Sequence, residues 1–121
     1  MSRHNAELGL YGERIAAVYL KNNGYKILQA NFRSPLGQID IVARQGEAVV
    51  FVEVKTRTSE NFGAPEEAVD FRKRRKMTQL GWFYLKTHNL TGAYCRFDVV
   101  SVLVKKEKDI SINLIKNAFG E

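Results

Sequence analysis

With 121 residues, 45% of them hydrophobic, the chain has the size and composition of a globular protein, and we expect a single domain over residues 1–121. Its 19 Lys and Arg against 13 Asp and Glu give a formal net charge of +6, which favours a polyanionic partner such as nucleic acid. The single cysteine excludes an intrachain disulfide, and no apolar run approaches the ~20 residues of a membrane-spanning helix. Because no apolar segment of the signal-peptide kind follows the first residues, we expect a cytoplasmic protein with no membrane partner.

The first predicted element is a helix from about Asn5 to Asn22. Its apolar residues recur at helical spacing and form one stripe, which consists of Leu8, Tyr11, Ile15, Val18 and Tyr19. Asn5 suits the N-cap position, and Gly24 suits the C-terminal stop. A strand from about Tyr25 to Arg33 follows, and residues 34–37 have the composition of a turn.

A β-hairpin is predicted next, with strands from Gln38 to Arg44 and from Glu47 to Thr56 and with Gln45-Gly46 as its two-residue loop. Residues 58–64 have no clear period and are predicted to form a loop. Pro65 suits the first turn of a long helix that ends near His88.

Two further strands are predicted, from Tyr94 to Val104 and from Ile110 to Ile115, with a polar turn at residues 105–108. The predicted order is therefore α-β-β-β-α-β-β. Apolar residues occupy both faces of the hairpin: Ile39, Ile41, Val50, Val52 and Val54 on one face, and Val42, Val49 and Phe51 on the other. Because a sheet that is apolar on both faces must be covered on both, we expect a three-layer α/β/α domain of the α/β class.

Two acidic residues and a lysine on the hairpin are the first candidates for a site. Side chains alternate along strands, so with Gln45-Gly46 as the loop, Asp40, Glu53 and Lys55 project from the same face, together with Gln38. The two carboxylates are then diagonal neighbours, ~7–8 Å apart between backbones and within reach of one shared ion.

Two carboxylates on an otherwise apolar face cost free energy unless they are paired or bound to a cation. A divalent metal such as Mg²⁺ would neutralise both, polarise a scissile phosphate and lower the pKa of a bound water. Lys55 would then hold that water or stabilise developing charge on the phosphate. The alternative is an ion pair of Lys55 with Glu53 or Asp40 that takes no part in chemistry.

Glu13 lies on the face of the first predicted helix opposite Tyr11 and Ile15. Its neighbours on that face are small or apolar: Gly9, Gly12, Ala16, Ala17 and Leu20. Because the positions four residues away on either side are Gly and Ala, no intrahelical salt bridge is available. The carboxylate therefore needs a metal, a metal-bound water or a distant Arg or Lys as its partner, unless this face is turned to solvent.

Four short motifs carry a resemblance to a known family. They are Gly12-Glu13, Gly37-Gln38-Ile39-Asp40, Val52-Glu53-Val54-Lys55 and Arg96-Phe97-Asp98-Val99-Val100. In these motifs and their order the chain resembles the bacterial UPF0102 (YraN) family over nearly its whole length. The resemblance implies a restriction-endonuclease-like fold with a central mixed sheet, within the PD-(D/E)xK superfamily, and a relation to archaeal Holliday junction resolvases.

The resemblance also implies roles for single residues. Asp40 and Glu53 correspond to metal ligands, and the backbone carbonyl of Val54 to a further ligand. Lys55 corresponds to the catalytic lysine, and Glu13 to an accessory acid that holds a metal-bound water. The implied cofactor is Mg²⁺ or Mn²⁺, and a homodimer is expected because the related resolvases act as dimers.

Two motif positions depart from the family pattern, and a third is expected to have a structural role. The family commonly has Glu where this chain has Gln38, which keeps the hydrogen-bonding ability but loses the charge. The change concerns a second metal site and leaves the first one intact. Ile39 precedes Asp40, so the proline of the superfamily's name is absent. Asp98, two residues from Arg96, is expected to be an ion-pair partner rather than a ligand.

Five consecutive basic residues, 72–76, lie on the second predicted helix. A helix turns ~100° per residue, so they point all round it and some must face the site. Lys73 and Lys76 match basic positions of the family and are the first candidates for phosphate contact, with Arg72 and Arg57 as further nucleic-acid-binding candidates. The alternative is a solvated face whose cations balance the acidic residues one turn earlier.

Two hypotheses of function follow. In the first, the protein is a metal-dependent nuclease that hydrolyses phosphodiester bonds in DNA, with branched or structured DNA as the substrate that the resemblance implies. In the second, it is a non-catalytic nucleic-acid-binding protein, or an adaptor in DNA repair, that keeps the nuclease fold. The intact set of Asp40, Glu53 and Lys55 favours the first, because a pure binder has no need of carboxylates beside phosphates.

Overall fold

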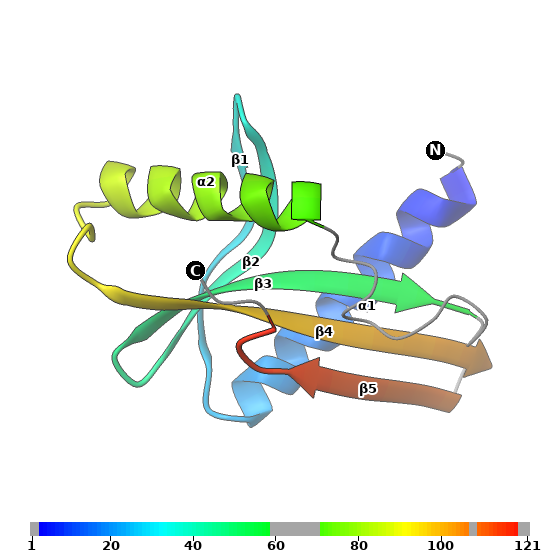
Figure 1. The fold of residues 1–121 in the computed structure, drawn as a ribbon. Coiled ribbons are helices and arrows are strands. Elements are labelled where there is room, and N and C mark those ends of the chain that lie inside the picture. Colours follow the sequence, from blue (N-terminus) through cyan, green and yellow to red (C-terminus); the bar gives the residue numbers. More distant parts are fainter. Residues whose placement is uncertain (1–2, 59–70, 107–108, 119–121) are drawn as a thin grey trace.

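The computed structural model describes residues 3–58, 71–106 and 109–118. In this part of the chain two helices and five strands follow one another in the predicted order (Figure 1). Their bounds are α1 Arg3–Asn22, β1 Lys26–Ser34, β2 Gly37–Gln45, β3 Ala48–Arg57, α2 Phe71–Thr87, β4 Tyr94–Lys106 and β5 Asp109–Ile115. The predicted helix start at Pro65, most of the predicted loop over 58–64 and half of the predicted turn over 105–108 lie outside the described residues. Neither described helix is long and apolar enough to cross a membrane.

The five strands form one mixed sheet in the order β1-β2-β3-β4-β5. β3 and β4 are parallel, and the other neighbouring pairs are antiparallel. A parallel pair needs a crossover connection, and α2 belongs to the segment that joins β3 to β4. α2 lies over one face of the sheet and α1 crosses the other (Figure 1). The protein therefore has the three α/β/α layers that its two-sided apolar pattern predicted.

Each face of the sheet carries its own apolar core. The core on the α2 side consists of Phe32, Ile39, Val42, Val49, Phe51, Met77, Leu80, Tyr84, Leu85, Phe97 and Val99. The core on the α1 side consists of Ala16, Leu20, Tyr25, Ile41, Ala43, Ala48, Val50, Val52, Val100 and Val102. One predicted position was wrong: Ile39 packs on the α2 side and not with Ile41. The pairing of β2 with β3 ends at Ile41 and Val52. The residues of β2 that precede Ile41 are not hydrogen-bonded to β3, so their side chains need not alternate in step with those of β3.

The hairpin loop differs from the predicted Gln45-Gly46. Gln45 pairs with Ala48, so the loop residues are Gly46 and Glu47. Gly46 has a φ of 59°, and a glycine at positive φ in the first central position is what a type II′ hairpin turn requires. The true register differs from the predicted one by two residues, so each side chain that stays in the ladder keeps its predicted face.

α1 packs on the sheet through its small residues. Ala16 is fully buried, and Gly12 lies so close to β3 that a Cβ on it would overlap the side chain of Thr56. Tyr11 and Val18, members of the predicted apolar stripe, are instead 40% and 57% exposed. Small side chains let the helix approach the strands closely and gain dense packing, which explains why this face is the buried one.

Candidate functional site

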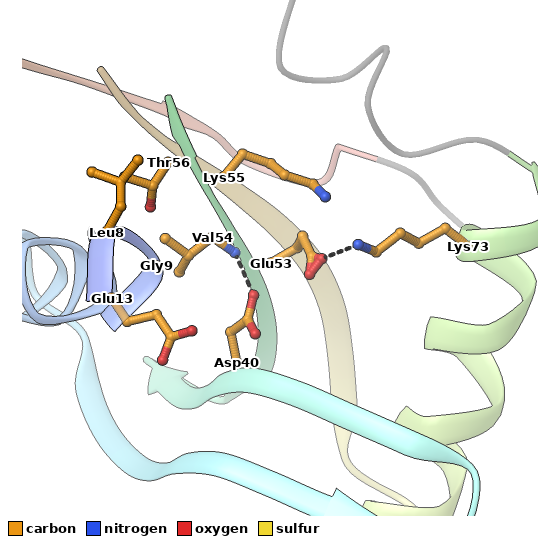
Figure 2. Close-up of a pocket in the computed structure, with 9 residues that line it drawn as sticks. All are labelled: Leu8, Gly9, Glu13, Asp40, Glu53, Val54, Lys55, Thr56 and Lys73. Atoms are coloured by element: carbon orange, nitrogen blue, oxygen red, sulfur yellow. Dashed lines mark hydrogen bonds and ion pairs between the residues drawn. The ribbon is translucent and has the colours of Figure 1, made fainter. Parts of the chain in front are cut away.

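Asp40 and Glu53 meet where β2 separates from β3. The last pair of the β2–β3 ladder is Ile41 with Val52, so Asp40 and Glu53 are the next residues outward on the two strands. In place of a ladder bond, the backbone N–H of Val54 donates to Asp40 Oδ2 at 2.9 Å (Figure 2). The Asp40 carboxylate thus lies where the two strands separate. We call this place, with Asp40, Glu53, Val54 and Lys55, the fork. Continued by one pair, the register sets Asp40 opposite Glu53, whereas the sequence had predicted a diagonal pair.

Two lysines approach the Glu53 carboxylate from different elements (Figure 2). Lys73 of α2 places Nζ 2.8 Å from Glu53 Oε2, and the Glu53 side chain is only 8% exposed. Lys55 follows two residues later on β3, and its amine lies close enough to that of Lys73 for the two to interact. The non-catalytic ion pair considered for Glu53 is thus formed with Lys73, which the sequence placed among the nucleic-acid-binding residues.

Glu13 reaches toward the same carboxylates from α1 (Figure 2). Its side chain is half-buried. Burial raises the pKa of the Glu13 carboxyl, with a smaller contribution from the charge of Glu53, whereas a hydrogen bond with the Asn31 side chain opposes the shift. Asn31 Oδ1 also accepts a hydrogen bond from Gln38 Nε2 at 2.8 Å. Glu13 and Gln38 are therefore joined through one residue of β1.

Asn31 was not among the site residues predicted from the sequence. Its φ is 55°, and Asn is among the few non-glycine residues that adopt the left-handed region at small cost. An Asn inside a predicted strand is itself unusual, since Asn is depleted in strands, and this was the one local signal. Its partners on α1 and β2 are set by the tertiary fold, so the sequence carried no sign of them.

The electrostatics of the fork favour a bound cation. Burial and then the neighbouring Glu53 carboxylate raise the pKa of Asp40 to about 7, against the opposing hydrogen bond from Val54. Burial lowers the pKa of Lys55, and the adjacent Lys73 adds to this effect. Burial also disfavours the charged form of Lys73, but its contact with Glu53 outweighs this and raises its pKa. Two carboxylates are thus held together with incomplete neutralisation.

The oxygen donors in the fork fit a hard divalent cation. Glu53 Oε2 is buried, and the ion pair with Lys73 at 2.8 Å compensates it, with the charge of Lys55 as a second contribution. Among the described residues, no group of three or more His, Cys, Asp or Glu side chains is arranged to hold a metal. Mg²⁺ needs no such group, because it usually keeps several waters and is held by one or two carboxylates together with substrate phosphate. Asp40, Glu53 and the Val54 carbonyl form a donor set of that kind.

Two cavities meet at these carboxylates. One of about 310 Å³ is lined by the residues of Figure 2: Leu8, Gly9, Glu13, Asp40, Glu53, Val54, Lys55, Thr56 and Lys73. The other, of about 240 Å³, is lined by Gly37, Gln38, Asp40, Glu53, Lys73, Lys76, Met77 and Leu80. The expected catalytic residues and two of the expected phosphate-binding lysines therefore come together at one place. Arg57 and Arg72 line neither of these cavities.

The acidic residue of the fourth motif belongs to a separate cluster. Asp98 is fully buried and accepts hydrogen bonds from the Tyr25 hydroxyl at 2.7 Å, from Arg96 Nε at 3.1 Å and from the Asn117 backbone N–H at 2.9 Å. Arg96 also donates to Tyr25 and to Gln45. Burial and the contact with Asp98 raise the pKa of Tyr25 to about 12. Asp98 is thus an ion-pair partner, as the sequence predicted.

Comparison with known proteins places the chain among close relatives. A family model described as "Uncharacterised protein family UPF0102" matches residues 12–102. A UPF0102 protein of Moorella thermoacetica is 51% identical over 112 residues, which cover 92% of this chain and 93% of the relative. One of Syntrophomonas wolfei is 49% identical over 115 residues, covering 95% and 99%. One of Caldanaerobacter subterraneus is 46% identical over 114 residues, covering 93% of each chain.

Proposed function

The chain belongs to the uncharacterised protein family UPF0102, and from the geometry of its site we propose that it is a metal-dependent nuclease that hydrolyses phosphodiester bonds in DNA. The family resemblance that the motifs predicted is confirmed at this level. The wider relation to PD-(D/E)xK nucleases and Holliday junction resolvases is part of the proposal. The observation that carries it is the meeting of Asp40, Glu53 and Lys55 at one cavity.

The carboxylates have the role of holding the cofactor. Asp40, Glu53 and the backbone carbonyl of Val54 hold Mg²⁺ or Mn²⁺, and Glu13 acts through a water molecule. When bound, the ion polarises the scissile phosphate and makes a water molecule more acidic. Asp40 is oriented for this role by the hydrogen bond from the Val54 N–H.

Lys55 acts on the water and on the phosphate. It projects from the same face of β3 as Glu53, because the two residues are separated by one position on a strand. Its ammonium stabilises the negative charge that develops on the phosphate during attack. Burial lowers the pKa of Lys55, which makes proton exchange at Nζ easier than at an ordinary lysine.

Nucleic acid is the proposed partner on the side of α2. Lys73 and Lys76 line the cavities beside the carboxylates, and Arg72 is exposed on the same helix. Arg57 continues β3 beyond the site. The formal net charge of +6 supports a polyanionic partner. Branched or structured DNA is proposed as the substrate, and a homodimer as the assembly, both by analogy with the resolvases.

One observation favours a second candidate function. The ion pair between Lys73 and Glu53 neutralises part of the site without any metal. A protein that only binds nucleic acid would retain such a pair as a structural feature. In this alternative the chain is a non-catalytic nucleic-acid-binding protein or a DNA-repair adaptor with the fold of a nuclease.

A labelled panel of DNAs separates the two functions. Duplex, single-stranded, flap and four-way-junction DNA are incubated with Mg²⁺, Mn²⁺ or EDTA and with the wild type, Glu53→Gln or Lys55→Ala. Glu47→Gln is the matched control, because Glu47 is exposed in the hairpin turn. We expect metal-dependent cleavage that falls ~100-fold or more in both site variants and is unchanged in the control. Binding of one of these DNAs with no cleavage in any metal would support the alternative.

A further inference from the structure

The proposed metal ion would compete with Lys73 for the Glu53 carboxylate. Lys73 Nζ lies 2.8 Å from Oε2, and this oxygen is buried. The Lys73 ammonium is therefore in direct contact with this oxygen and compensates its charge, and Lys55 adds a second contribution. A divalent ion placed at the same oxygen would repel an ammonium at that distance strongly, because the site is poorly solvated. The two cations therefore exclude each other from this oxygen.

The Lys73 side chain can leave Glu53 without a movement of the sheet. It is 37% exposed, whereas Glu53 is 8% exposed, and it comes from α2 and not from the sheet that carries the carboxylates. A lysine ammonium sits on a flexible four-carbon stem and can move without moving its helix. Lys73 also lines both cavities, so its ammonium can pass from the first to the second, which it shares with Lys76.

We propose that the Lys73 ammonium is the counter-cation of the Glu53 carboxylate in the metal-free protein. Binding of the divalent ion then displaces this ammonium, which moves to a phosphate of the nucleic acid. This inference rests on the proposed function and deepens it. The displaced ammonium needs a new anion, and the second cavity lies beside the basic surface of α2. Metal and nucleic acid therefore favour each other's binding. The metal releases the Lys73 ammonium, and a phosphate of the nucleic acid compensates the charge of that ammonium.

Mn²⁺ binding tests the exclusion directly, because Mn²⁺ is observed by electron paramagnetic resonance without any cleavage assay. Lys73→Met removes the ammonium and keeps most of the side-chain volume, and Lys73→Arg keeps a positive charge. We expect Lys73→Met to bind Mn²⁺ about 3–10-fold more tightly than the wild type, and Lys73→Arg to bind it no more tightly. The control is Lys76→Met, which removes the same charge from the second cavity and leaves Glu53 paired; its Mn²⁺ affinity should change less than about twofold.

Thermal unfolding distinguishes this role from a merely structural one. In EDTA, Lys73→Met should unfold at a lower temperature than the wild type, because Glu53 loses its compensating charge. Mn²⁺ should then stabilise the variant more than it stabilises the wild type. A purely structural lysine would lower stability and leave the Mn²⁺ affinity unchanged or weaker.

The transfer to phosphate is tested in a Lys55→Ala background, which removes cleavage. Mn²⁺ should strengthen binding of a four-way junction more in Lys55→Ala than in Lys55→Ala with Lys73→Met, and an equal effect would overturn the transfer. If the wild type binds Mn²⁺ but Lys73→Met binds it no more tightly, or if Lys76→Met gains as much, this inference fails and the nuclease proposal stands. If none of the proteins binds Mn²⁺, both fail.

Discussion

The residues of the fork are placed at a cost to folding stability. The pKa of Asp40 is about 7, because the group is largely buried and faces Glu53. Glu13 experiences the same two effects more weakly. Burial and the neighbouring negative charge raise these pKa values and do not stabilise the fold. Carboxyl groups with raised pKa values are found most often at sites that bind a cation or transfer a proton. The stability of the metal-free protein should therefore report on the site.

Asp40→Asn should stabilise the metal-free protein at alkaline pH. A carboxyl with a pKa of about 7 when folded and an ordinary value of 3.8 when unfolded binds its proton more tightly in the folded state. Protonation of Asp40 therefore adds to the free energy of unfolding at low pH, and this contribution is lost as the pH rises from about 4 through about 7. Asparagine keeps an oxygen for the Val54 N–H and cannot ionise. In EDTA at pH 8 we expect urea denaturation to give a free energy of unfolding about 1–3 kcal/mol higher than that of the wild type, allowing for partial solvent screening.

The same comparison at pH 4 supplies the internal control, since both proteins are then uncharged at this position. Glu47→Gln at the exposed hairpin turn should match the wild type at both pH values. An Asp40→Asn protein that is less stable than the wild type at pH 8 would mean that the ionised carboxylate is already compensated without metal.

At the scale of elements, the close approach of α1 to β3 positions Glu13. Gly12 faces Thr56 with no room for a Cβ, and the next residue along the helix is the one that points to Asp40 (Figure 2). α2 approaches the sheet in a similar way at Gly81, where a Cβ would lie 3.0 Å from the Phe51 ring. The site is thus built by two helices that close on opposite faces of one strand.

Gly12→Ala should push α1 away from β3 and misplace Glu13. The added Cβ overlaps the Thr56 side chain, and relief requires a shift of the helix or of that side chain. We expect a loss of about 1–3 kcal/mol in the free energy of unfolding, as for an overpacked core, together with weaker Mn²⁺ binding. Urea denaturation and Mn²⁺ titration measure the two effects.

Gly9→Ala is the matched control for stability, because a Cβ at Gly9 meets nothing within 4 Å. Alanine is the better helix former, so this variant should be as stable as the wild type or up to ~1 kcal/mol more stable. Equal stability of Gly12→Ala and Gly9→Ala would show that the helix does not depend on the close approach.

At the scale of the whole molecule, one buried ion pair joins distant parts of the chain. Asp98 of β4 accepts hydrogen bonds from Tyr25, which lies between α1 and β1, from Arg96 on its own strand and from the backbone of Asn117 after β5. It shares no residue with the fork between β2 and β3. The fourth sequence motif therefore stabilises the fold, whereas the first three contribute residues that line the two cavities.

Asp98→Asn should destabilise the protein and leave its site intact. The substitution leaves the Arg96 guanidinium without its buried counter-charge, and breaking a buried pair in this way costs about 3–5 kcal/mol. Tyr25→Phe removes the two hydrogen bonds of the hydroxyl, to Asp98 and from Arg96, but keeps the ion pair, and it should cost about 1–3 kcal/mol. Chemical denaturation measures both. A large loss of Mn²⁺ affinity in folded Asp98→Asn would contradict the separation of the two clusters.

The sequence sufficed for the layers of the fold and for the members of the fork. Strand side chains alternate with a period of two, so the faces of the residues within the β2–β3 ladder were predicted correctly even though the loop lies at Gly46 and Glu47 and not at Gln45 and Gly46. An error of one residue would have put Asp40 on the wrong face. The error was two residues, which keeps the parity of the strand and sets Asp40 opposite Glu53 in the continued register.

Other features depend on tertiary contacts that no local pattern encodes. α1 carries two apolar faces, and only the approach of β3 decides that the small one is buried and that Tyr11 is exposed. The separation of β2 from β3 at Ile41 moves Ile39 to the other core. The pairing of Lys73 with Glu53 depends on how α2 lies over the sheet, and a run of five basic residues does not indicate which one turns inward.

The most direct test of the nuclease proposal is a single-turnover time course on a labelled four-way junction, with Mg²⁺ or EDTA and with the wild type, Glu53→Gln and Glu47→Gln proteins. The proposal predicts cleavage products with the wild type and Glu47→Gln in Mg²⁺, no products in EDTA, and a rate at least ~100-fold lower for Glu53→Gln. Cleavage of the junction by Glu53→Gln at the wild-type rate, or a junction that is bound but stays intact in Mg²⁺ and in Mn²⁺, would contradict it.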